Sequence, residues 1–322
     1  MSWDDVLGQD LAKRMVSAHL AAGKAAGAYL FAGPEGVGKR RIALELAKAL
    51  NCPSNVSQPC DACVTCQQLT KGTHPDVHRV APSGASNQIK IDDVRHVLGR
   101  IALRPYSARV QVAILENVER MTEEAANSLL KSLEEPTAFT CFLLTTDRLS
   151  HCLPTIVSRC QIIRCQALPA ETIQRILMDR HDIGPHIAGA TARLAHGSVS
   201  RAIELAGRWT TYERLLNRLA DPTPTRWMET PLPESRQDVV QLLDGMTTWL
   251  RDLAAAATGD PAALAHATQE RSLRAQTTRV DVDRCLETAF DLISLRESVE
   301  QFVSPRLVAS LAREKWLALI SV

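Results

Sequence analysis

A glycine-rich loop between two apolar segments constrains the fold of this chain more than any other feature. The loop runs from Gly33 to Lys39 with the sequence GPEGVGK, and it ends the short apolar run at residues 28–33 (AYLFAG). Residues 40–50 (RRIALELAKAL) follow, with their apolar side chains on one face at helical spacing. This order predicts a buried strand, a loop and a helix, which is the layout of a phosphate-binding loop. In that layout the backbone N–H groups, the helix dipole and Lys39 all face phosphate oxygens, whereas the alternative is a glycine-rich turn without a ligand.

Strands and helices alternate through the first half of the chain. Continuous apolar runs at residues 110–115 and 140–146 predict two further buried strands, and residues 91–103 and 123–133 have the periodicity of helices. Strands that alternate with helices form a mostly parallel sheet covered by helices. We therefore expect an α/β domain with a phosphate-binding loop over residues 1–166.

Strand signals disappear after this domain. Residues 167–207 contain short helical segments and predict a small helical domain, and residues 208–322 predict a third, all-helical domain with a proline-rich break at 221–233. A length of 322 residues, of which 45% are hydrophobic and 23% charged, suits two or three globular domains and excludes a disordered chain.

The charge balance limits how this chain can meet nucleic acid. It has 37 basic and 36 acidic residues and a net charge of +1, so it lacks the positive field that drives tight binding to DNA by one protein alone. The sequence contains no apolar run of about 18–20 residues, and its beginning, MSWDDVLGQD, is acidic where a signal peptide is basic. We expect a cytosolic protein that has no membrane partner and that contacts DNA only together with other proteins.

Four of the nine cysteines form a candidate metal site. Cys52, Cys60, Cys63 and Cys66 have the spacing C-x7-C-x2-C-x2-C, whereas the other five are scattered. In a reducing cytosol, four clustered thiolates favour one tetrahedral zinc ion over disulfides. A shell of four protein ligands leaves no position for water, so this zinc would only brace the insertion at residues 52–66. The alternative is four thiols without a metal.

The candidate nucleotide site has lost two groups that ATP hydrolysis needs. The position after the loop lysine, where Ser or Thr binds magnesium, is Arg40. After the strand at 110–115, Glu116 and Asn117 stand where an acidic pair would hold magnesium and activate water, and an amide cannot accept that proton. We expect hydrolysis to be lost and leave nucleotide binding open. The candidate residues of this degenerate site are Gly33, Gly36, Gly38, Lys39, Arg40, Glu116 and Asn117.

The triplet Ser158-Arg159-Cys160 follows a short helix predicted at residues 153–157. By itself it has two interpretations. Arg159 is either a solvated arginine at a helix end or an arginine finger that reaches a phosphate group in a neighbouring subunit.

Together these stretches resemble one family, the AAA+ clamp-loader subunits of bacterial DNA polymerase III. The resemblance covers about half of the chain. It is carried by Asp5-Val6-Leu7-Gly8-Gln9, AYLFAGPEGVGK at 28–39, the four clustered cysteines, THPDV at 73–77, AANSLLKSLEEP at 125–136, and the triplet at 158–160. It implies an AAA+ domain at 1–166 with the zinc-binding insertion, a helical lid at 167–207 and an all-helical collar for oligomerisation at 208–322.

Departures from the family pattern indicate a member that is not a motor. Besides Arg40 and the Glu116-Asn117 pair, the lid pattern GSxR would place an arginine at position 200, where Ser200 stands with Arg201 one residue late. The resemblance then implies that Lys39 and Arg40 are relics that stabilise a closed loop, and that Arg159 acts in trans on a neighbour's ATP. The chain would have no ATPase activity of its own and would serve the polymerase holoenzyme as a scaffold.

The same resemblance implies the partners. They are motor subunits of the tau or gamma type and a delta-type subunit in a hetero-pentameric ring, which handles primer-template DNA and the sliding clamp. The alternative is a self-sufficient AAA+ ATPase motor in which Glu116 holds magnesium. A P-loop metabolite kinase is disfavoured because it would need the missing magnesium-binding hydroxyl.

Overall fold

A computed structural model describes most of the chain as two compact units. The described residues are 3, 6–23, 25, 27–54, 58–84, 86–221, 223–259, 264–278, 280–300 and 303–320, so Asp5 of the resemblance lies outside them. Unit 1 comprises Met1–Ile173 with His196–Ser200, and unit 2 comprises Gln174–Ala195 with Arg201–Val322. The predicted division into domains at 1–166, 167–207 and 208–322 stays a prediction.

Unit 1 contains a five-stranded sheet in which every pair of neighbouring strands is parallel, in the order β2-β3-β4-β1-β5. The strands are β1 (Ala28–Ala32), β2 (Val77–Val80), β3 (Gln111–Leu115), β4 (Thr140–Thr146) and β5 (Gln161–Arg164). The three central strands are buried along their whole length, as expected for strands covered on both faces. The predicted strands and the mostly parallel sheet are therefore confirmed.

The two edge strands were not predicted. β2 (VHRV) and β5 (QIIR) are short and partly exposed, so neither forms a continuous apolar run. Their polar residues suit the edge of a sheet, where one side of the backbone has no partner strand.

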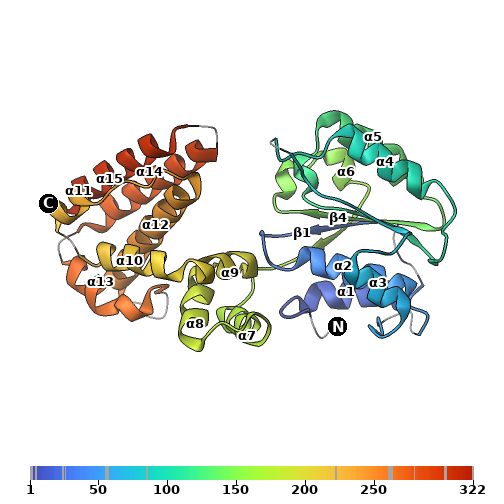
Figure 1. Ribbon diagram of the computed structural model, residues 1–322, viewed down its shortest axis with the longest axis horizontal. Helices are drawn as coiled ribbons and strands as arrows, with labels where there is room; N and C mark the ends of the chain where they lie inside the picture. The colour runs from blue at the N-terminus through green and yellow to red at the C-terminus, as the bar shows by residue number, and fades with distance from the viewer. Residues whose placement is uncertain are drawn as a thin grey trace. The chain divides into compact units, whose positions relative to one another are not determined.

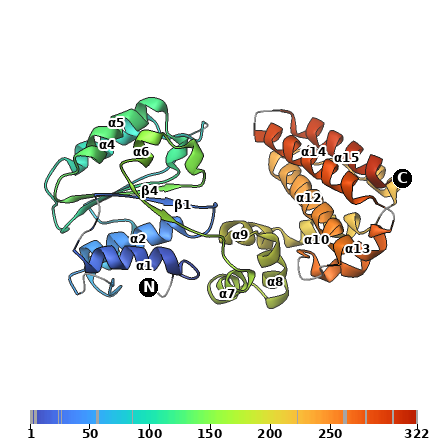
Figure 2. The same cartoon turned by 180° about the vertical axis from the view of Figure 1, so that it is seen from behind.

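Helices cover both faces of the sheet, as Figures 1 and 2 show. One face is covered by α1 (Asp10–Ala21), α2 (Lys39–Asn51) and α3 (Val64–Lys71), and the other by α4 (Ile91–Ile101), α5 (Glu123–Glu134) and α6 (Pro154–Val157). Alternate strand residues serve the two cores: Tyr29 and Phe31 of β1 belong to one, and Ala28 and Leu30 to the other. The predicted helices at 40–50, 91–103, 123–133 and 153–157 are confirmed, whereas α1 and α3 were not predicted.

The rest of the chain is helical. The helices are α7 (Ala170–His181), α8 (Pro185–Leu194), α9 (Val199–Gly207), α10 (Trp209–Leu219), α11 (Pro224–Glu229), α12 (Arg236–Thr258), α13 (Glu270–Thr277), α14 (Val282–Glu300) and α15 (Pro305–Ile320). In unit 2 a core with Trp227, Trp249 and Trp316 forms around α12, α14 and α15. No strand follows β5 among the described residues, so the predicted α/β-then-helical fold class is confirmed. Among all the described residues, no helix is both long enough and apolar enough to cross a bilayer.

Candidate functional site

The lysine of the phosphate loop binds to carbonyl groups of the loop itself. It connects the carboxyl end of β1 to the N-terminus of α2, and the Lys39 side chain is 7% exposed. The Lys39 ammonium donates to the Gly33 carbonyl at 2.8 Å, the Pro34 carbonyl at 2.6 Å and the Asp147 carboxylate at 2.5 Å. An ammonium group has three protons, so these acceptors use all of them.

Glycine is favoured at three positions of the loop, for a different structural reason at each. A Cβ atom on Gly33 would lie 2.2 Å from the Cys165 carbonyl oxygen, and one on Gly36 would lie 2.2 Å from Ser198 Oγ. Gly38 has open space but a φ of +100°, a left-handed conformation that favours glycine. The Val199 N–H also donates to the Gly36 carbonyl at 2.9 Å, so the turn before α9 packs directly on the loop within unit 1.

Glu116 is held by two arginines. Its Oε1 atom lies 3.3 Å from Arg40 Nε and 2.5 Å from Arg79 Nε. The residue that replaces the magnesium-binding hydroxyl therefore neutralises the carboxylate that would have held magnesium. Arg79, which lies on β2 next to β3, was missed by the sequence analysis because β2 itself was missed.

Asn117 is joined to the loop lysine by a carboxylate that the sequence analysis also missed. Its side-chain amide donates to Asp147 Oδ2 at 2.7 Å and to Glu119 Oε1 at 3.2 Å, and Asp147 Oδ1 accepts from Lys39. Asp147 directly follows β4, as Glu116 directly follows β3. Ligands of parallel sheets bind beyond the carboxyl ends of the strands. The position of Asp147 directly after a predicted strand could therefore have identified it as a site residue.

Arg201, which follows the position where the predicted lid pattern expects an arginine, forms an ion pair with a carboxylate of unit 2. Arg201 Nη2 lies 2.8 Å from Asp244 Oδ2 within unit 2. Ser200, which stands at the expected position of that arginine, lies against the loop: its Cβ is 3.0 Å from where a Cβ on Gly36 would be.

Arg159 follows α6, and its side chain is 32% exposed. Its Nε donates to Glu134 Oε1 at 2.8 Å, its Nη2 bonds to the same oxygen, and its Nη1 donates to the Thr155 carbonyl at 3.0 Å. These partners come from α5 and α6, so the guanidinium is oriented by residues of its own chain. The neighbouring Cys160 is half-buried, and burial raises the pKa of its thiol to about 12, so it is neutral at pH 7.

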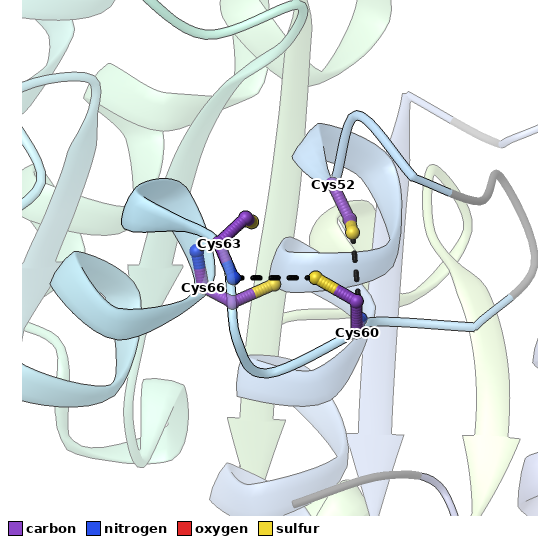
Figure 3. Close-up of side chains that lie close together, drawn as sticks. All are labelled: Cys52, Cys60, Cys63 and Cys66. Carbon is purple, nitrogen blue, oxygen red and sulfur yellow. Dashed lines mark hydrogen bonds between the residues drawn. The ribbon is translucent and has the colours of Figure 1, made fainter.

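Cys52, Cys60, Cys63 and Cys66 lie together, as Figure 3 shows, and their sulfur atoms are all within 4.8 Å of one another. Cys52 follows the last residue of α2, Cys63 is the N-cap of α3, and Cys66 lies in the first turn of α3. Tetrahedral zinc–sulfur bonds of about 2.3 Å place sulfur atoms about 3.8 Å apart, so this set fits one zinc ion after small adjustments.

Backbone N–H groups already face these sulfurs. The N–H groups of Cys60, Cys63 and Cys66 each donate to the sulfur of the preceding cysteine of the set at 3.4 Å. The Cys63 N–H is the largest of the causes that lower the pKa of Cys60 to about 6, whereas burial raises the pKa of Cys66. The donor set therefore suits a cation that prefers thiolates.

Comparison with known proteins identifies the family. The family described as "DNA polymerase III, delta subunit" matches residues 8–169, which include the phosphate loop, the four cysteines and Arg159. The chain belongs to this family of clamp-loader subunits. The resemblance found in the sequence is thereby confirmed.

Two delta′ relatives and one gamma relative show the range of similarity. The chain is 37% identical to DNA polymerase III subunit delta′ of Bacillus subtilis over 179 residues, or 56% of this chain and 53% of the relative. It is 34% identical to the Pseudomonas aeruginosa delta′ subunit over 247 residues, or 72% of each chain. It is 33% identical to a Buchnera aphidicola gamma subunit over 207 residues, or 62% of this chain and 56% of the relative.

The chain thus spans little more than half the length of two of these three relatives. Among solved structures, a gamma subunit-related protein of Thermotoga maritima is similar with a TM-score of 0.49 and 18% identity, over 97% of this chain and 99% of its own.

Proposed function

We propose that this chain is a clamp-loader subunit of the delta′ type that does not hydrolyse ATP, and that it lends Arg159 to a neighbouring ATPase subunit. The observation that carries the proposal is the state of the nucleotide site. Lys39 is bonded to two loop carbonyls and Asp147, and Glu116 is paired with Arg40 and Arg79. The groups that would bind phosphate and magnesium therefore already have partners in the chain.

The missing base supports the same conclusion. Asn117 stands where a carboxylate would accept the proton of the attacking water, and its amide instead donates to Asp147 and Glu119. Without a magnesium-binding hydroxyl and a base, the site lacks both means of activating water.

Arg159 suits action on a neighbour. Its side chain is partly exposed, and the carboxylate of Glu134 holds the Nε edge of the guanidinium. Nη1 also donates to the Thr155 carbonyl and to Ser158 Oγ, so a phosphate oxygen would accept from the remaining Nη2 N–H or replace one of these partners. Such a finger stabilises the charge of phosphoryl transfer and is worth about a thousandfold in rate or more.

A self-sufficient motor is the second candidate, favoured by the 33% identity to a gamma subunit. It would need Glu116 to leave both arginines and bind magnesium, and Glu119 or Asp147 to act as base. Each of these changes costs an ion pair or a hydrogen bond that the chain already makes.

ATP turnover separates the two candidates. The purified chain is expected to hydrolyse no ATP, and Arg159→Ala to slow hydrolysis at the neighbouring site of the assembled complex by about a thousandfold. Arg164→Ala, which removes another exposed arginine nearby, serves as the control and is expected to leave turnover unchanged. Turnover by the isolated chain would support the motor, and unaltered turnover by the complex with Arg159→Ala would refute the finger.

The remaining assignments belong to the same proposal. The partners are motor subunits of the tau or gamma type and a delta-type subunit in a hetero-pentameric ring, with primer-template DNA and the sliding clamp bound through the complex. The metal is structural zinc on Cys52, Cys60, Cys63 and Cys66, and the location is the cytoplasm. The helices of residues 208–322 form the collar of that ring.

A further inference from the structure

A buried charge cluster lies beside the four cysteines. The Lys48 side chain on α2 is 0% exposed, and its ammonium lies 2.9 Å from Glu45 Oε1 and 2.8 Å from Asp61 Oδ1. The Glu45 side chain is 1% exposed and that of Asp61 is 16% exposed. Burying charges costs free energy that their attraction offsets only in good geometry, and apolar residues of similar volume often stabilise a protein as well. The cluster therefore calls for a role besides stability.

Its two ion pairs differ in what they connect. Glu45 and Lys48 are both on α2, three residues apart, so their contact joins one helix to itself. Asp61 lies between the ligands Cys60 and Cys63, so its contact joins the turn of these ligands to α2. Asp61 also has a φ of +55°, a left-handed conformation rare for residues other than Gly, Asn and Asp.

The α2 end of this connection carries the first ligand. The Cys52 N–H donates to the Lys48 carbonyl at 2.7 Å, so Lys48 lies one turn before Cys52. The end of α2 is in turn fixed to the segment before β3, because Arg109 Nη2 donates to the Cys52 carbonyl and the Val110 N–H donates to Asn51 Oδ1. The Lys48–Asp61 ion pair extends this fixed position to the turn of Cys60 and Cys63.

We propose that the Lys48–Asp61 ion pair preorganises the four-cysteine site for a divalent metal ion of the zinc type, with Lys48 and Asp61 as positioning residues. This inference rests on the proposed metal site. The turn of Cys60 and Cys63 would otherwise have to be positioned against Cys52 when the metal binds, and a contact that joins this turn to α2 reduces that cost. Groups that orient metal ligands typically change metal affinity by about 10- to 100-fold when they are substituted.

The test compares two substitutions that remove one carboxylate each from Lys48. Asp61→Asn reduces the ion pair between the segments to at most a hydrogen bond to a neutral amide, whereas Glu45→Gln, the matched control, makes the same change in the contact within α2. Zinc affinity of the full chain would be measured by competition with a chromophoric chelator, and cobalt absorption would report coordination by four thiolates. We expect Asp61→Asn to weaken zinc binding by about 10- to 100-fold and Glu45→Gln by less than about threefold.

A further variant keeps the inference testable if Asp61→Asn does not fold. Lys48→Met combined with Glu45→Gln removes the lysine without leaving the buried Glu45 unpaired, and it is expected to weaken zinc binding as much as Asp61→Asn does. Equal effects of Asp61→Asn and Glu45→Gln, or an affinity of Asp61→Asn within about twofold of the unmodified chain, would overturn the positioning role. An unmodified chain that binds neither zinc nor cobalt would overturn the metal site as well.

Discussion

Asp76 offers a prediction whose size follows from its contacts. It lies just before β2 and is 3% exposed, and its carboxylate accepts N–H groups from Tyr106 at 2.7 Å, Ser107 at 2.7 Å and Ala108 at 2.8 Å. It thereby anchors the loop between α4 and β3 to the edge of the sheet. Asp76→Asn keeps the shape of the side chain and removes its charge, so it tests how much this anchor contributes.

The contribution depends on pH in a direction that can be worked out. Burial opposes ionisation of Asp76, but the three backbone N–H groups outweigh it and lower its pKa from 3.8 to about 2. This difference corresponds to about 2.4 kcal/mol of folding free energy, which is fully present well above pH 4 and is lost as the pH falls through about 2. At pH 3 the unfolded chain is mostly protonated at this residue and the folded chain is not, so about 1.3 kcal/mol remains.

The unfolding free energy of unit 1 would be measured by pulse proteolysis in urea, with mass spectrometry to locate cleavage in that unit. We expect Asp76→Asn to cost about 2 kcal/mol at pH 7 and about 1 kcal/mol at pH 3. Asp92→Asn, at an exposed carboxylate on α4, is the control and should stay within about 0.5 kcal/mol at both values. An equal cost of Asp76→Asn at pH 7 and pH 3, or one no larger than that of the control, would refute the reasoning.

Three further predictions concern the sites. Asp147→Ala removes the carboxylate that occupies Lys39, so the isolated chain should bind ATP about tenfold more tightly by calorimetry; unchanged or weaker binding would contradict the closed loop. Glu134→Ala releases the Nε edge of Arg159 and should slow ATP hydrolysis at the neighbouring site by about tenfold without changing KM. Glu134→Gln, which keeps an acceptor, should restore most of that rate, and equal rates of the two variants would argue against positioning. With free zinc at a hundred times its Kd, bound zinc should add about 2.7 kcal/mol to the unfolding free energy of unit 1. Removing the zinc with a chelator should therefore lower that free energy by the same amount in the proteolysis assay, whereas no change would argue against a structural metal.

Burial decided which strands the sequence could predict. β1, β3 and β4 are covered on both faces, so each forms a continuous apolar run that stands out from its surroundings. β2 and β5 are sheet edges with exposed residues, and their pairing depends on neighbours far away in the chain. The helix α3 is only eight residues long, and its N-cap is Cys63, which appears in the sequence as a metal ligand rather than a helix cap.

The sequence predicted the members of the sites better than their contacts. It grouped the four cysteines, and their sulfurs lie together; it also paired Arg40 and Glu116 with one nucleotide site, and the two form an ion pair. Arg79, Asp147 and Glu134 escaped it because each contacts its partner across a long stretch of chain. No local spacing encodes such contacts, since they exist only once the sheet has formed.

The contacts of the phosphate loop also show that a nucleotide motif can contribute to folding independently of ATP hydrolysis. Gly33 leaves room for the Cys165 carbonyl at the end of β5, Gly38 begins α2 in a left-handed conformation, and Lys39 joins the loop to Asp147 after β4. These three motif residues therefore have structural roles where β1, β4, β5 and α2 meet, without any phosphate. On the proposed function, loss of the magnesium ligand and the base would affect only chemistry. Loss of these three residues would instead disturb the sheet on which α5 and α6 pack, and these two helices carry the partners that orient Arg159. In such a chain the loop is kept by folding, and its presence alone does not establish that ATP is bound.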